Sequence, residues 1–84
     1  MKNENLANKD LYYKTKDLYV ASLLFCLGVK LQKAEKTDGI LFFYFNDKED
    51  CDDVMSDFYN RKIKIEPLKF IESIKIAKGF IYNY

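Results

Sequence analysis

The chain carries six consecutive apolar residues at positions 40–45, ILFFYF. Side chains of a β-strand alternate between two faces, so this segment divides into two apolar rows of three. One row is Leu41, Phe43 and Phe45, and the other is Ile40, Phe42 and Tyr44. Because both rows are apolar, we expect that both faces of this strand are covered by other parts of the fold or by a partner.

The segment before this strand completes a β-hairpin. Residues 29–36, VKLQKAEK, alternate at their start and predict a strand, and residues 37–39, TDG, predict the turn. A three-residue loop with Gly39 in the left-handed region places Leu31 opposite Phe45. A two-residue Asp-Gly loop would place Leu31 on the other face. We expect the three-residue loop, because it adds Leu31 to the more apolar row.

Three helices are predicted around the hairpin. The first spans about 16–27, where Thr15 suits the N-cap and Gly28 suits the left-handed stop. From residue 18 to residue 27 only Ser22 is polar, so we expect this helix to be buried on more than one side. The other two helices span about 48–59 and 67–82.

The element order predicts the fold class. Residues 10–15 suggest a short strand, so the order is β-α-β-β-α-α. We expect an α+β fold with a small, mainly antiparallel sheet and three helices. We expect residues 10–84 to form a single domain and residues 1–9 to form a polar N-terminal arm.

The row of Ile40, Phe42 and Tyr44 bears on the oligomeric state. The first helix is expected under the other row, so a later helix or another molecule must cover this one. The last helix has an apolar stripe of sufficient length: Phe70, Ile71, Ile74, Ala77 and Ile81. We therefore favour a monomer over a homodimer. Self-association through Ile40, Phe42 and Tyr44, or contact with another partner, is the alternative.

Composition and charge limit the classes of function. The chain has 84 residues with a net charge of +1, which disfavours a general polyanion binder. Acids cluster in residues 47–57 and bases in residues 58–84. Cys26 and Cys51 lie in apolar helical patterns and are expected to be small core residues. The first ten residues are polar with no hydrophobic region behind them. We expect a cytoplasmic protein that does not cross a membrane.

The sequence shows no catalytic constellation. Histidine is absent, which removes Ser-His and Cys-His pairs and histidine zinc sites. The three glycines form no phosphate-binding motif. We expect no enzymatic activity, no catalytic residue, no metal site and no cofactor.

The segment 46–57, NDKEDCDDVMSD, contains the first candidate site. Asp50, Asp53 and Asp57 follow the spacing i, i+3 and i+7, so they share one side of the predicted helix. Three interpretations stay open: a solvated helix face, a surface that docks on a protein, and a divalent metal site. The metal interpretation lacks the calcium-loop pattern.

The segment 59–69, YNRKIKIEPLK, contains the second candidate site. Bases beside an aromatic residue are compatible with nucleic-acid contact. The candidate contacts are Tyr59, Arg61, Lys62 and Lys64. The alternative is a solvated link beside an aromatic packing residue.

Four segments carry a resemblance to a known family. They are YYKTKDLYVASLLFCLG (12–28), ILFFYFND (40–47), DFYNRKIKIEPLKF (57–70) and the ending KGFIYNY. They resemble an uncharacterised family of small bacterial and phage domains. Its members typically show a Thr-x-Asp-Leu-Tyr-Leu-Ala opening, a Phe-x-Phe strand, an aromatic-Asn-Gly step before Val-x-Pro, and a Leu-Lys-x-x-Ile-Tyr ending. Here Arg61 replaces the glycine, and Ala77-Lys78 replaces Leu-Lys. The resemblance implies residence in bacteria, phages or mobile elements and transfers no activity.

Small size, the lack of catalytic chemistry and the segregated acidic helix favour a non-enzymatic accessory protein of a phage or mobile element. We expect it to dock on a host protein or nucleoprotein complex, most concretely as an inhibitor of a bacterial defence complex. One alternative is a nucleic-acid-binding accessory factor that uses the basic residues 61–78. Another is a small oligomer that sequesters a nucleotide-like ligand.

Overall fold

The computed structural model describes residues 11–83 and confirms the predicted α+β fold class. The predicted arm, residues 1–9, lies outside the described residues. The three strands form one antiparallel sheet in the order β1-β3-β2. In chain order the elements are β1 (Tyr13–Thr15), α2 (Leu18–Cys26), β2 (Leu31–Thr37), β3 (Ile40–Phe45), α3 (Lys48–Tyr59) and α4 (Pro67–Tyr82).

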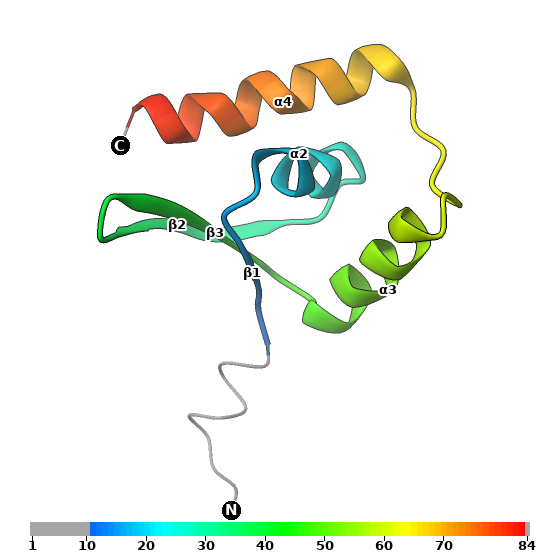
Figure 1. Cartoon of the computed structure of the whole chain (residues 1–84), viewed down its shortest axis with the longest axis horizontal. Helices are drawn as coiled ribbons and strands as arrows, with labels where there is room; N and C mark the ends of the chain where they lie inside the picture. The colour runs from blue at the N-terminus through cyan, green and yellow to red at the C-terminus, as the bar shows by residue number, and fades with distance from the viewer. Residues whose placement is uncertain (1–10, 84) are drawn as a thin grey trace, which may run out of the picture.

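The core lies on one face of the sheet, under α2 and α4. In Figure 1, α2 lies between the sheet and α4. Leu41, Phe43 and Phe45 are buried on this face, as predicted. The ring of Phe43 meets Phe25 of α2 at 6.1 Å and Phe80 of α4 at 6.0 Å between centroids, both edge to face. One apolar row of β3 thus anchors both helices.

The β2–β3 hairpin has a two-residue loop, so the three-residue loop predicted from the sequence is wrong. Thr37 pairs with Ile40, which leaves only Asp38 and Gly39 in the loop. These two residues have φ angles of 53° and 81°. A turn with two left-handed residues follows the twist of antiparallel strands, and Asp-Gly is a favoured pair for it. The local turn chemistry therefore decides the loop length.

A β-bulge gives Leu31 its predicted partner in spite of the shorter loop. The register shifts between Leu31 and Lys33, so that Lys33 pairs with Tyr44 and Leu31 pairs with Phe45. Gln32 is the additional residue of the bulge, which leaves two residues of one strand against one of the other. Leu31 is therefore on the core face, although the reason differs from the one expected.

The N-terminus of α2 is capped by Asp17, and the prediction of Thr15 as the cap is wrong. The backbone N–H groups of Tyr19 and Val20 donate to Asp17 Oδ1 at 2.8 and 3.0 Å. Thr15 is still part of strand β1, so the helix begins later in the chain. At the other end, Gly28 with a φ of 82° terminates the helix as predicted.

Helix α4 packs against α2 through small residues. Its buried side chains are Ser73 and Ala77, one turn apart. The hydroxyl of Ser73 donates to the backbone oxygen of Lys69 at 2.9 Å, so its burial leaves no polar group without a partner. Ile71 was expected to face inward but is 48% exposed. The side of α4 that faces α2 is centred on Ser73 and Ala77 instead.

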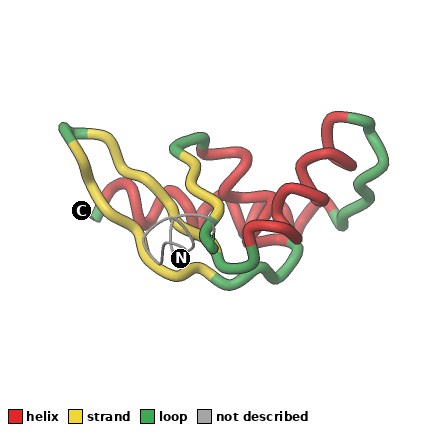
Figure 2. Tube along the Cα trace, turned by 90° about the horizontal axis from the view of Figure 1, so that it is seen from below, coloured by secondary structure: helices red, strands yellow, loops and turns green. Residues whose placement is uncertain are grey.

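The opposite face of the sheet, called the outer sheet face below, carries Ile40, Phe42 and Tyr44. The prediction that the last helix covers this row is wrong, because α4 packs on α2 and Phe43 on the other side (Figure 1). Seen from below, the strands lie in front of α4 and no described helix lies over them (Figure 2). The structure thus removes the argument that favoured a monomer.

Candidate functional site

The predicted acidic site lies on the exposed side of α3. Asp50, Asp53 and Asp57 are all exposed. Cys51 and Met55, on the other side of the helix, are buried in the core. The structure therefore brings the three carboxylates together on a side of α3 that faces solvent.

Two of these three carboxylates weaken the helix that carries them, whereas Asp50 lies in the first turn, where the helix dipole favours a negative charge. Asp53 lies three residues after Asp50 and four before Asp57, so it repels both, at about 0.2–0.5 kcal/mol for each pair. Asp57 also lies in the last turn of α3, where the helix dipole disfavours a negative charge. The ion pair within α3 joins Lys48 to Asp52, which is outside the cluster. The stability of α3 therefore does not account for Asp53 and Asp57.

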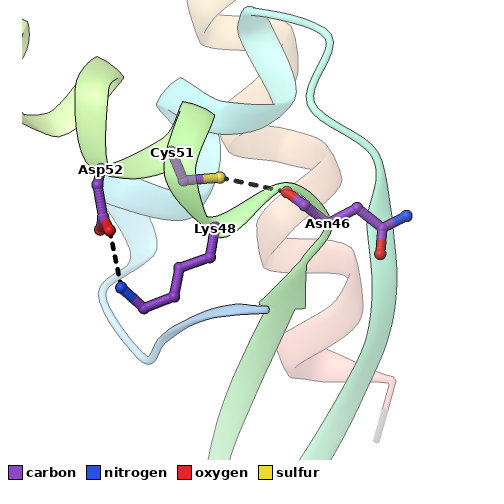
Figure 3. A network of polar contacts seen from close by, with 4 residues as sticks. All are labelled: Asn46, Lys48, Cys51 and Asp52. Carbon is purple, nitrogen blue, oxygen red and sulfur yellow. Dashed lines mark hydrogen bonds and ion pairs between the residues drawn. The ribbon is translucent and has the colours of Figure 1, made fainter. Parts of the chain in front are cut away.

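The start of α3 contains a buried thiol, Cys51 (Figure 3). Its Sγ donates to the backbone oxygen of Asn46 at 3.5 Å, beside the 2.7 Å ion pair of Lys48 and Asp52. Burial foremost, and then nearby carboxylates including that of Asp52, raises the pKa of the Cys51 thiol to about 11. The thiol stays protonated at neutral pH, whereas a nucleophilic cysteine needs its thiolate.

An apolar groove of about 330 Å³, called the α3 groove below, opens beside the C-terminal end of α3. Phe58 at this groove is 40% exposed, and its ring centroid lies 5.3 Å from that of Tyr59, which is 72% exposed. Exposed aromatic side chains beside an apolar hollow are typical of protein interfaces. The residues that line the groove include Tyr19, Leu23, Phe58, Arg61, Ile63 and Phe70.

The basic segment predicted to contact nucleic acid is an extended link with one side packed into the α3 groove. Ile63 and Ile65 line the groove, and Lys62 and Lys64 alternate with them and are exposed. Arg61 also lines the groove. The structure thus separates the four predicted contacts. Arg61 lines the groove, the ring of Tyr59 lies beside that of Phe58, and the two lysines lie on the outer side of the link.

Arg61 has a backbone conformation that suits glycine. Its φ is 61°, directly after the C-cap residue Asn60. The N–H of Arg61 donates to the oxygen of Phe58 at 3.0 Å, and that of Lys62 donates to the oxygen of Asp57 at 2.8 Å. This pair of bonds is the usual glycine-type helix end. A residue with a Cβ pays about 1–2 kcal/mol in the left-handed region, and such strain often marks a functional position.

Sequence reasoning missed the α3 groove, because its lining comes from four separate segments. Two signals in the sequence point to it. The alternation of Ile63 and Ile65 with lysines requires an apolar partner on one side of the link. Tyr19 is a large aromatic residue on a side of α2 that the core does not use, and it is 62% exposed. Neither signal identifies the other segments that complete the groove.

Three other kinds of feature would bear on function in the described part of the chain: metal-ligand clusters, disulfides and membrane-spanning helices. Among residues 11–83, no three His, Cys, Asp or Glu side chains are grouped so that they could hold a metal ion. Cys26 and Cys51 are buried thiols without a disulfide, which confirms that they are small core residues. None of the helices within 11–83 combines the length and the apolar character that a bilayer crossing requires.

A comparison with models of protein families identifies the family of the chain. Residues 10–83 match the model of the family described as Domain of unknown function (DUF5659). The chain belongs to this family. The match agrees with the resemblance to an uncharacterised family that the sequence segments carry. No curated protein and no solved structure matches the chain significantly. The surfaces of this fold are therefore the guide to its function.

Proposed function

We propose that the protein is a non-enzymatic docking module that binds another protein through the acidic side of α3 and the α3 groove. In this proposal it acts in the cytoplasm of a bacterium, as the product of a phage or mobile element. Its concrete role is to inhibit a bacterial defence complex. The resemblance of the sequence to small bacterial and phage domains supports the setting. The unpaired thiols of Cys26 and Cys51 suit a reducing compartment.

The observation that carries the proposal is the meeting of two surfaces at the end of α3. The carboxylate cluster ends at Asp57. The next two residues carry exposed rings: Phe58 lines the α3 groove, and the ring of Tyr59 lies beside that of Phe58. Arg61 is part of the lining of the same groove. Tyrosine and arginine dominate the binding energy of many protein interfaces. Adjacent like charges select a partner of the opposite sign.

The two surfaces have different tasks in this proposal. A partner side chain that enters the α3 groove buries the exposed part of Phe58, and full burial of such a side chain is worth about 1.5–3 kcal/mol. The carboxylates attract a basic partner and speed the encounter. Asp53 and Asp57 destabilise α3, and in this proposal they are kept because they contribute to binding. We expect the partner to present a basic surface with a protruding apolar side chain.

Charge reversal on α3 tests the acidic surface. The tagged protein is used to capture partners from a bacterial lysate, and binding of each identified partner is then measured by calorimetry with purified components. Asp50→Lys combined with Asp53→Lys should abolish binding without loss of fold, because both positions are exposed. Glu72→Lys reverses an exposed acid on α4 and should leave the affinity unchanged. Unchanged binding by the folded double variant would refute a role for the acidic side.

A second variant tests the exposed aromatic side chain beside the α3 groove separately. Tyr59→Ala removes a ring that is 72% exposed, so the fold should persist. Loss of an interface tyrosine at a central position typically costs about 2 kcal/mol or more, which is a roughly 30-fold weaker affinity. Binding that depends on Asp50 and Asp53 but not on Tyr59 would limit the docking surface to the acidic side of α3.

A further inference from the structure

The outer sheet face carries two partly exposed aromatic rings on the middle strand of the sheet. Ile40 is 43% exposed, and the side chains of Phe42 and Tyr44 are half-buried. The strands are seen from this side in Figure 2, with none of α2, α3 and α4 over them. Residues at alternate positions of a strand point to the same side, so the two rings follow one another along β3.

Two lysines from the flanking strands lie over these rings. Lys14 of β1 and Lys33 of β2 are both paired with Tyr44 across the sheet. Lys14 Nζ lies 4.4 Å from the centroid of Phe42, and Lys33 Nζ lies 4.8 Å from that of Tyr44. Glu35, which is 3.5 Å from Lys33 Nζ, is the only acid within the three strands. The face therefore combines rings with an excess of positive charge.

We propose that the outer sheet face binds single-stranded nucleic acid. Phe42 and Tyr44 stack with successive bases, and Lys14 and Lys33 contact the phosphates beside them. A base stacks on an exposed ring more strongly than an exposed ammonium does, so the bases displace the lysines from the rings. The freed lysines then reach the phosphates. This inference uses a surface apart from the α3 groove and does not rest on the proposed function.

Charge favours a nucleic acid over a second copy of the chain. A twofold contact through this face would bring Lys14 and Lys33 of both copies into one interface, where only Glu35 of each copy offsets them. A nucleic acid supplies the opposite charge along its whole length. It must be single-stranded, because the bases of a duplex are stacked on each other and cannot stack on protein rings. Rings in line on an open sheet face are used in this way by RNA-binding sheets.

Titration of the full chain with fluorescent oligouridylate and oligothymidylate, at several salt concentrations, tests the lysines. Lys14→Gln combined with Lys33→Gln should weaken binding and lower the slope of log K against log salt by about 1.4, since each phosphate contact on a single strand contributes about 0.7. Lys62→Gln combined with Lys64→Gln removes the same charge from the 60–66 link. This control should bind as the unaltered protein does. Equal losses from both pairs would overturn the proposal.

The rings are tested by leucine replacements, which keep apolar cover on the sheet. Phe42→Leu and Tyr44→Leu should each weaken binding roughly 5- to 150-fold, with little change in Tm. The proposal is overturned if the unaltered protein binds neither oligonucleotide, if it binds duplex equally well, or if both leucine variants bind normally. It is also overturned if light scattering shows a dimer that Phe42→Glu converts to a folded monomer, because a second copy then covers this face.

Discussion

Replacement of Arg61 by glycine should stabilise the protein, although it removes a large side chain. Arg61 has a φ of 61°, where a residue with a Cβ loses about 1–2 kcal/mol. Glycine relieves this strain but returns about 0.4–1 kcal/mol, because the unfolded chain becomes more flexible. We expect a net gain of about 0.5–1 kcal/mol in the free energy of unfolding. For a domain of this size the gain corresponds to a Tm increase of about 2–8 °C.

Urea and thermal unfolding, followed by circular dichroism, measure this change. Arg61→Ala is the matched control, because it removes the same side chain but keeps the strained backbone. It should be about 1 kcal/mol less stable than Arg61→Gly. Gly28→Ala and Gly39→Ala make the reverse test. Both glycines have positive φ angles, 82° and 81°, and open space where a Cβ would lie, so each variant should lose about 1 kcal/mol through the backbone alone.

Equal stability of Arg61→Gly and Arg61→Ala would refute the reasoning, because the left-handed turn would then carry no cost. A second readout connects stability with docking. If Arg61 is retained for its position at the α3 groove, Arg61→Gly should be the more stable protein and the weaker binder. A more stable variant with full affinity would leave the strain without a functional cause.

Three further predictions concern the core, a helix cap and pH. Phe43→Ala should cost about 3–5 kcal/mol in urea unfolding, since the side chain is fully buried; a near-neutral effect would contradict the core face of β3. Asp17→Ala should lose about 1 kcal/mol, whereas Asp17→Asn should keep most of the stability; equal losses would mean that the carboxylate charge matters more than its hydrogen bonds. Stability should fall as the pH rises from about 9 to about 11, because the pKa of the Cys51 thiol is raised from 9.0 to about 11 in the folded protein. The unfolded thiol loses its proton first, so this contribution is complete below its pKa and is lost through the folded one. Cys51→Ala should flatten this part of the profile; an unchanged slope would assign it to another group, such as Tyr13, whose pKa burial also raises.

The fold could be predicted largely from the sequence, because alternation and helical periodicity mark which side chains share a face. The errors lie where two local signals compete. Thr15 and Asp17 are both good caps, and the pairing of Thr15 in β1 decides between them. The sequence contains a signal for the bulge: Leu31 and Ala34, which both lie on the core face, are three residues apart and break the period of two.

The candidate site was less predictable, because it depends on segments that are distant in sequence. The exposure of Asp50, Asp53 and Asp57 follows from one helix and its period, so it could be read from a single segment. Lys14 lies far along the chain from Phe42, and only the strand order β1-β3-β2 brings the two side chains together. An apolar row on its own therefore suggested a covering helix, whereas the structure has lysines there.

The bulge at Gln32 gives the hairpin a place where the length of the chain can vary. Loss of Gln32 would leave Leu31 opposite Phe45 and would restore a regular ladder, since the residue is additional to the pairing. Strand β3 holds no such spare residue, and a deletion there would turn the apolar rows over to the wrong sides. One-residue gaps between related sequences should therefore collect at this position of β2, where evolution can shorten or lengthen the strand without disturbing the interior.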